Sequence, residues 1–301
     1  MSLATAANLD PAVVARLEGL ELRARHVVDG YLAGRRRSRR RGQSVEFAEH
    51  REYAPGDDPR YVDWKAFGKT DRMYLKQYEA ETNLVCTLAV DVSESMRYRS
   101  PAAALSKLDY GACVAAAVAL LVYQQRDSVG LFTFDDRVQS VVPVGSNPND
   151  LAQLSQVLES VDSARRSDLQ QAFDEIADRQ RRRSVTVVIS DLLGDVARTL
   201  AGLRHLHYRR HEVLVLQVLD PAEVDFPFDR ATRFMGLENL PRVQAEPAGL
   251  RKAYQAALAR FLEQLQAGCR ESQIDYELCR TDEPFDAPLR RLLTRRAVQG
   301  G

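Results

Sequence analysis

Three oxygen-bearing side chains follow one apolar run at alternate positions. The run Leu84-Val-Cys-Thr-Leu-Ala-Val90 leads directly into Asp91, Ser93 and Ser95. Such a run is typical of a strand buried on both faces, and open α/β sheets bind ligands where these strands end. One carboxylate and two hydroxyls are hard oxygen ligands, which suit Mg²⁺, Mn²⁺ or Ca²⁺. We therefore expect a divalent cation here; the alternative is that these residues only cap the next helix.

Two later segments offer further oxygen ligands. Ser184-Val-Thr-Val-Val-Ile-Ser190 is a second strand of the buried type, and it ends in Asp191. Between the two strands, a loop presents Ser167 and Asp168 immediately before a helical pattern. Strands that each end in a carboxylate can face one another across a single crevice. Asp168 is expected to cap the following helix.

Strand and helix patterns alternate throughout the segment that contains these residues. The alternation predicts an α/β fold with a doubly wound, mostly parallel sheet. The expected strands are 84–90, 128–134, 138–142 at an edge, 184–190 and 212–219, and the expected helices are 104–124, 149–160, 168–181 and 196–208. Residues 84–220 would form the core, 221–249 an insertion, and 250–301 a helix (250–269), a strand (274–279) and a short helix (288–298) that complete the core.

The amino-terminal part, residues 1–83, differs in composition from the rest. A helical pattern covers 10–33, and the basic run Arg35 to Arg41 follows as an expected solvated loop. From Gln43 to Tyr78, short β-like pieces alternate with turn chemistry such as Pro55-Gly-Asp-Asp-Pro59, which predicts a small β-rich subdomain. Nucleic-acid contact by the arginines is the sharper alternative, but no aromatic residues interleave with them.

Composition limits the classes of function. The chain has 301 residues, 45% of them hydrophobic, and a formal net charge of zero, so it can bury a large core and has no global field for nucleic acid or membrane. Its four cysteines show no CxxC spacing, which disfavours zinc and disulfide frameworks. The amino terminus lacks a signal-peptide core, and the longest apolar run, 112–123, is too short to span a bilayer. We expect a cytoplasmic protein.

The pattern of these motifs resembles two known groups of domains. The order of Asp91-x-Ser93-x-Ser95, Ser167 and Asp191 resembles the metal-ion-dependent adhesion site of von Willebrand factor type A domains. The stretch from Val45 to Lys65, with Tyr78-Glu-Ala-Glu-Thr82, resembles the bacterial family called domain of unknown function 58.

That resemblance implies a function as well as a fold. All five residues would then be metal ligands, directly or through water, and an acidic side chain of a partner would fill an open coordination position. Ser167 stands where such sites usually have threonine. The resemblance also implies a MoxR-type AAA+ ATPase as partner in protein maturation or assembly; the chain itself has no GxxxxGK[ST] phosphate loop.

An enzyme is the less favoured alternative. Asp91 could be the nucleophile of a phosphohydrolase, but the position of the proton donor, two residues later, is Ser93, which is no general acid near neutral pH. His205, His207 and His211 gather near a helix end, where cations are favoured, and are not spaced as metal ligands. We therefore expect a metal-dependent adaptor without catalytic residues.

Overall fold

The computed structural model describes residues 10–39, 51–52, 73–75, 84–161, 168–230, 232–234, 243–245, 247–285, 287–288 and 291. The chain divides into two compact units. One comprises Met1–Gly34 with Asn83–Gly301, and the other is Arg35–Thr82. In the second unit, β1 (Arg51–Glu52) pairs antiparallel with β2 (Tyr74–Leu75), and the remainder of the expected β-rich subdomain lies outside the described residues.

The larger unit is built on a six-stranded sheet in the order β10-β7-β6-β3-β4-β5. Its strands are β3 (Val85–Asp91), β4 (Ser128–Phe134), β5 (Val138–Gly145), β6 (Val185–Ser190), β7 (Glu212–Leu219) and β10 (Asp275–Arg280). Only β5, at one edge, runs antiparallel to its neighbour. The predicted α/β class and the mostly parallel sheet are confirmed.

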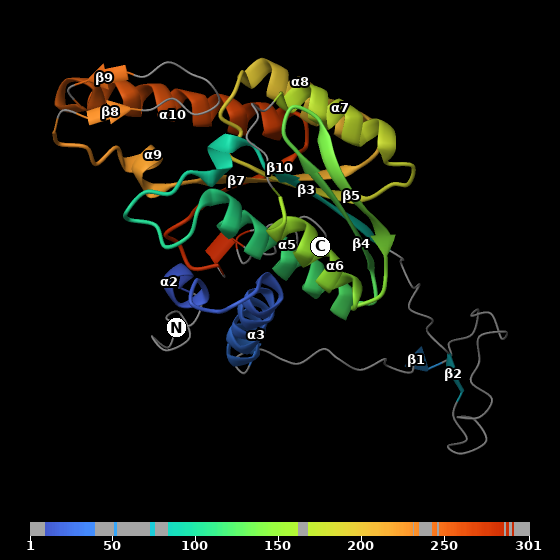
Figure 1. The fold of residues 1–301 in the computed structure, drawn as a ribbon. Helices are drawn as coiled ribbons and strands as arrows, with labels where there is room; N and C mark the ends of the chain where they lie inside the picture. Colours follow the sequence, from blue (N-terminus) through green and yellow to red (C-terminus); the bar gives the residue numbers. More distant parts are fainter. Residues whose placement is uncertain are drawn as a thin grey trace. The chain divides into compact units, whose positions relative to one another are not determined.

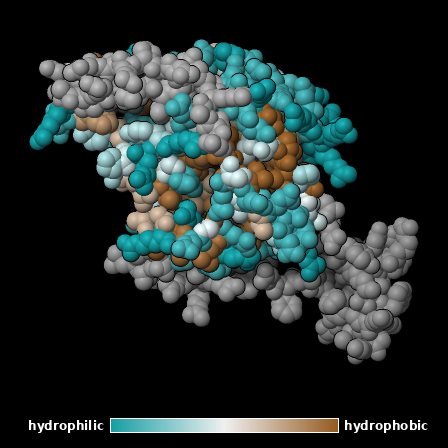
Figure 2. All heavy atoms as spheres, in the orientation of Figure 1, coloured by the Kyte–Doolittle hydropathy of each residue, from teal (hydrophilic) through white to brown (hydrophobic). Residues whose placement is uncertain are grey.

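Helices cover both faces of this sheet (Figure 1). One face packs against α5 (Lys107–Gln124) and α6 (Asp150–Glu159), and the amino-terminal helices α2 (Pro11–Val14) and α3 (Leu20–Arg39) extend the same hydrophobic cluster on the far side of α5 and α6 (Figure 1). The other face packs against α7 (Leu169–Arg179), α8 (Val196–Tyr208) and α10 (Pro247–Glu271). The outer surface over α7 and α8 is mainly hydrophilic (Figure 2), as expected of helices that bury one side only.

Helix α5 is the central helix of its layer. Its long run of small apolar residues is buried, and a Cβ on Gly111 would lie 3.0 Å from Ile189 of β6. By length and composition alone α5 could cross a membrane, but 67% of it is buried inside the fold. The apolar character of α5 is therefore accounted for by core packing, as the sequence predicted.

The amino-terminal helix differs from the prediction in two respects. The pattern over 10–33 forms two helices, because the chain turns at Gly19, whose φ of +79° suits glycine. Val14, Leu20, Val27 and Val28 are buried in the same hydrophobic cluster as residues of α5 and α6, so this segment packs with the α/β unit.

The basic run also differs from the expected loop. Residues 35–39 continue α3, in keeping with the high helix propensity of arginine, whereas Arg40 and Arg41 lie outside the described residues.

The insertion between β7 and the last strand has structure of its own. It contains α9 (Pro221–Asp225) and the hairpin of β8 (Thr232–Phe234) with β9 (Val243–Ala245). Helix α10 begins at Pro247, before the predicted start at Leu250, since proline is favoured at a first helical position. Of the expected terminal helix at 288–298, only residues 288 and 291 are described, both helical.

Candidate functional site

The candidate site lies where the chain reverses its direction of winding across the sheet. From β3 the chain proceeds to β4 and β5 on one side, and then returns to β6 and β7 on the other. Such a switch point leaves a crevice at the carboxyl ends of the two central strands. Val90 of β3 pairs with Ile189 of β6, so Asp91 and Ser190 lie side by side at those ends.

The Asp91-x-Ser93-x-Ser95 loop is held compactly by its own hydrogen bonds. Ser93 N donates to Asp91 Oδ1 at 2.9 Å, and Ser190 Oγ donates to Asp91 Oδ2 at 2.5 Å. The Oγ atoms of Ser93 and Ser95 are 3.1 Å apart at the start of the short 3₁₀ helix η2 (Glu94–Arg97). Asp91 and Ser93 are fully buried, whereas Ser95 is half-buried. Three predicted ligands therefore lie together, with one side toward solvent.

Asp91 is a buried carboxylate with an unfavourable charge. Burial first, and then the nearby charge of Asp191, raise the pKa of Asp91 from 3.8 to about 7. Hydrogen bonds from Ser190 and Ser93 only partly oppose this rise in pKa. Among the residues that the structure describes, no lysine, arginine or histidine forms an ion pair with Asp91. A cation at this loop would remove the cost of the charge.

Asp191 is also near the loop, but its carboxylate already has a cationic partner. Lys107 Nζ lies 2.7 Å from Asp191 Oδ2, and neither side chain is more than 2% exposed. Leu193 N donates to Asp191 Oδ1 at 3.2 Å. The intervening Leu192 has a left-handed φ of +52°, which turns the chain directly after β6. The fourth predicted ligand is thus placed at the site but is engaged internally.

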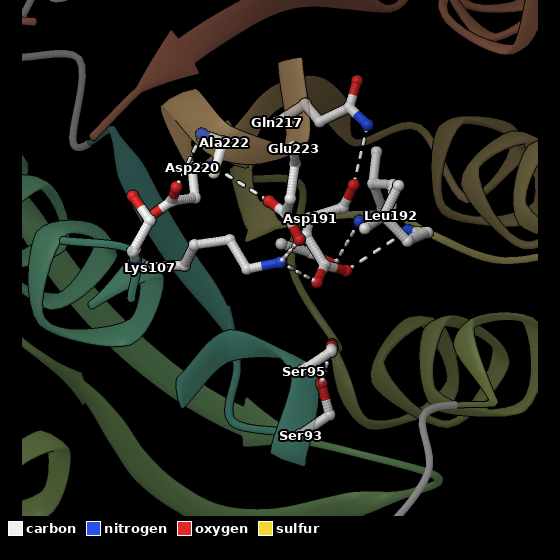
Figure 3. Close-up of polar contacts among 12 residues, drawn as sticks. Ser93, Ser95, Lys107, Asp191, Leu192, Gln217, Asp220, Ala222 and Glu223 are labelled. Carbon is white, nitrogen blue, oxygen red and sulfur yellow. Dashed lines mark hydrogen bonds and ion pairs between the residues drawn. The ribbon is translucent and has the colours of Figure 1, made fainter. Parts of the chain in front are cut away.

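Lys107 joins a third acidic side chain to the site (Figure 3). Its ammonium also lies 2.7 Å from Glu223 Oε1, and Glu223 Oε2 accepts a hydrogen bond from Asp220 N in the capping box of α9. Burial lowers the pKa of Lys107, but the two carboxylates outweigh burial and raise this pKa well above its usual range. Lys107 is therefore a charged residue in the interior of the protein.

Two other predicted positions have different outcomes. Ser167 lies outside the described residues. Asp168 caps α7, as expected, by accepting from Gln171 N at 3.3 Å, and both of its oxygens accept from Arg198 at 3.0 and 2.8 Å. Arg97 of η2 donates to the carbonyl of Val161 at 3.0 Å. This hydrogen bond connects the Asp91-x-Ser93-x-Ser95 loop, called the serine loop below, to the end of the segment that precedes Ser167.

The donor set fits a hard divalent cation in part. Within the described ranges, no three His, Cys, Asp or Glu side chains are grouped to hold a metal ion. A cation here would therefore need the hydroxyls of Ser93 and Ser95 beside the Asp91 carboxylate, and these oxygens are the ligands that Mg²⁺ accepts. His205 and His207 lie in the last turn of α8, as expected, and His205 contacts Asp174.

Sequence reasoning did not identify four residues that shape the site. They are Lys107, Ser190, Gln217 and Glu223. Gln217 donates to the carbonyl of Asp191 at 2.7 Å and accepts from Tyr276 at 2.5 Å, which fixes the backbone of the loop after β6. A lysine at the first position of an apolar helix was the one available signal, since a positive charge there opposes the helix dipole.

Comparison with known proteins gives one family and several relatives. The model of the family described as protein of unknown function DUF58 matches residues 49–263. The proteins named Uncharacterized protein Rv1480 of Mycobacterium tuberculosis and Uncharacterized protein Mb1516 of Mycobacterium bovis are each 32% identical over 221 residues, which is 72% of this chain and 68% of theirs.

Solved structures with a similar arrangement include two that are distant in sequence. The conserved hypothetical protein BatB from Bacteroides thetaiotaomicron has a TM-score of 0.45 and 15% identity, over 71% of this chain and 98% of that one. The SpRpn10 VWA domain has a TM-score of 0.39 and 10% identity, over 69% of this chain and 94% of that one.

Proposed function

We propose, for a chain that belongs to the DUF58 family, that the carboxyl ends of β3 and β6 form a cation-dependent site that binds an acidic side chain of another protein. Membership of this family and the α/β sheet support a protein-interaction domain. The finer elements of the proposal are the divalent cation, the acidic ligand and the class of partner. They are supported by the chemistry of the site.

The buried carboxylate of Asp91 is the observation that most supports a cation. It is fully buried, it lies near a second carboxylate, and both of its oxygens accept hydrogen bonds instead of an ion pair. A protein retains such a charge at a cost, which a bound cation would offset. Asp91, Ser93 and Ser95 would hold the ion, and Mg²⁺ is the best candidate, with Mn²⁺ or Ca²⁺ as substitutes.

The proposed ion would supply an electrophilic position for an incoming carboxylate. Two of the three nearby ligands are neutral hydroxyls, so little of the charge of the cation would be cancelled by the protein. Ser95 is half-buried, so this part of the loop has some access to solvent. Asp191 would support the site electrostatically, and Ser167 remains a ligand candidate from the resemblance alone.

The same geometry gives less support to a phosphohydrolase. A phosphoryl-accepting Asp91 would need an acid two residues later, and Ser93 occupies that position. Among the described residues, the neighbouring acid Asp191 already accepts hydrogen bonds from Lys107 Nζ and Leu193 N. We therefore propose a binding protein without catalysis of its own.

The proposed partner is a protein with an exposed acidic residue, and the resemblance favours a MoxR-type AAA+ ATPase in the cytoplasm. A capture experiment tests this proposal. The chain is immobilised and incubated with a native lysate of its source, in Mg²⁺ or in EDTA, and the retained proteins are identified by mass spectrometry.

Asp91→Ala is the variant for this experiment, and Ser160→Ala is the control, because Ser160 is exposed and its hydroxyl donates only to the carbonyl of Val157 within the described chain. We expect a set of partners that includes an AAA+ ATPase to be retained in Mg²⁺ by the wild type and by Ser160→Ala. EDTA or Asp91→Ala should release them. Retention of the same set in EDTA would contradict the role of the cation.

A further inference from the structure

Lys107 contacts the site in a way that the proposed function does not use. Its side chain has no exposed surface, and its ammonium is shared by Asp191 of the loop after β6 and Glu223 of α9, each at 2.7 Å. Among described residues, Lys107 is the only cationic side chain paired with Asp191. The ammonium also lies over the ring of Tyr98, with its nitrogen 5.9 Å from the ring centroid.

The position of this ammonium affects what Asp191 can do. A carboxylate at a hydrogen-bonding distance from a buried ammonium gives up much of its negative potential to that partner. A divalent ion at the serine loop would have to share Asp191 with Lys107, whereas Asp91 has no cationic partner among the described residues. The internal ammonium therefore competes with a metal ion for one of the two carboxylates.

We propose that Lys107 is an internal cation that weakens metal binding at this site by occupying Asp191, and that Glu223 reduces this competition by sharing the ammonium. This inference rests on the proposed function, since it concerns the same cation. It makes Lys107 and Glu223 positioning residues: neither would touch the ion, and both would set how much of the Asp191 carboxylate the ion receives.

A charge-balanced pair of substitutions separates competition from a general field effect. Lys107→Met with Glu223→Gln removes one positive and one negative charge, so the net charge around the site is unchanged. If Lys107 competes for Asp191, the double variant should bind Mn²⁺ more tightly, by about tenfold, because the carboxylate is released. The binding is measured from the electron paramagnetic resonance signal of free Mn²⁺ during a titration near neutral pH.

Glu223→Gln alone should have the opposite effect. The ammonium of Lys107 then has Asp191 as its one remaining carboxylate partner, so it interacts with Asp191 more strongly. Mn²⁺ should therefore bind more weakly, by about threefold. This variant keeps the Lys107–Asp191 ion pair and is expected to fold. Mn²⁺ affinity that is unchanged or tighter in Glu223→Gln would overturn the proposal even where the double variant does not fold, as judged by a cooperative melting transition.

The matched control is Arg280→Met with Asp225→Asn, which is also charge-balanced. This pair joins β10 to α9, the helix that carries Glu223, through hydrogen bonds of 3.0 and 2.7 Å. Neither residue forms an ion pair with Lys107, Asp191 or Glu223 among the described residues. Removal of this pair should leave Mn²⁺ affinity unchanged. A comparable increase in the control would assign the effect to loosening of α9 and would overturn the proposal.

The remaining outcomes distinguish this proposal from the proposed function. If the wild type binds no Mn²⁺ but the double variant does, Lys107 is confirmed as a competing cation and the proposed cation-dependent function is wrong for the native chain. If the wild type binds Mn²⁺ and the double variant binds it equally or less well, only the role of Lys107 is overturned. If neither binds Mn²⁺, both are overturned.

Discussion

At the scale of single residues, the site is defined by an asymmetry between two aspartates. Asp91 ends β3, Asp191 directly follows the neighbouring strand β6, and both are buried. Asp191 is neutralised by Lys107, whereas Asp91 receives only hydrogen bonds within the described structure. From the sequence alone, both aspartates were predicted as metal ligands of equal standing. In the structure, Asp91 is the one whose buried charge an external cation would stabilise.

Substitution of Asp91 by Asn should stabilise the protein in the absence of metal. Asn keeps an acceptor for Ser93 N but removes the buried charge and its repulsion by Asp191, so we expect the free energy of unfolding in EDTA to rise by about 2 kcal/mol. Urea unfolding measures this quantity. The gain in stability on addition of Mg²⁺ should be smaller in Asp91→Asn than in the wild type. A loss of stability in EDTA would contradict this account of Asp91.

A second residue-scale prediction concerns His211, which is buried beside Ser184, with its Nδ1 3.0 Å from the serine Oγ. Burial, and then Arg209, lower the pKa of His211 below 6.5. The folded state therefore binds this proton less readily than the unfolded chain does. The corresponding stability is complete above pH about 6.5 and is lost as the pH falls below that value.

The measurement for His211 is the urea midpoint at a series of pH values between about 8 and 5, where His titrates. The wild type should lose more stability toward the acidic end than His211→Gln, which has no titrating ring and keeps an acceptor for Ser184. Parallel pH profiles for the two proteins would show that His211 is not the group responsible.

Some residues of the site could be predicted from the sequence and others could not. Asp91, Ser93 and Ser95 could be predicted because they share one loop after one strand, so their proximity follows from local spacing. Lys107 and Glu223 are separated from Asp191 by 84 and 32 positions in the chain, and their meeting depends on how α5 and α9 pack. No local pattern encodes such a contact between distant segments.

At the scale of elements, the site depends on where β3 and β6 end and on the helices that hold these strands in place. Helices α7 and α8 pack on the sheet face that includes Ala89 of β3 and Val188 of β6. Gly202 of α8 permits this approach: a Cβ there would lie 3.1 Å from the Gln170 Cα and 3.0 Å from the Phe173 Cβ. The backbone of α7 cannot move away without disturbing the helix.

Gly202→Ala should therefore destabilise the protein, by about 1 to 3 kcal/mol, because α7 and α8 would be forced apart. Gly249→Ala in the first turn of α10 is the matched control, since nothing lies within 4 Å of its added methyl group. That change should stabilise by about 0.5 kcal/mol through helix propensity. Thermal or urea unfolding of the two variants compares them; equal effects would contradict the close packing of α7 on α8.

Most elements could be predicted, because periodicity reports the pattern of burial directly. Strands 128–134 and 212–219 and helix 196–208 were predicted with the bounds that the structure shows. The break between α2 and α3 was missed because one glycine with a positive φ turned the chain within an otherwise continuous helical pattern. The assignment of this segment to a domain depends on tertiary packing of its apolar face, which periodicity does not specify.

At the scale of the molecule, the α/β unit combines a six-stranded sheet with a segment inserted after its β7 strand. The insertion returns to the site through α9, whose Glu223 reaches Lys107 and whose Asp220 accepts from Ser100 N at 2.8 Å. Tyr254 of α10 donates to the carbonyl of Glu223 at 2.8 Å. The insertion therefore contributes a charged side chain, Glu223, to the electrostatics of the site.

The central claim is that Asp91, Ser93 and Ser95 bind a divalent cation, and direct titration of the purified chain with Mn²⁺ tests it. We expect one site per chain in the wild type and in Ser160→Ala. The double substitution Ser93→Ala with Ser95→Ala should weaken binding by about tenfold or more, because both hydroxyl ligands are lost. Binding that is unchanged when both hydroxyls are removed, or no saturable binding in the wild type, would contradict the account.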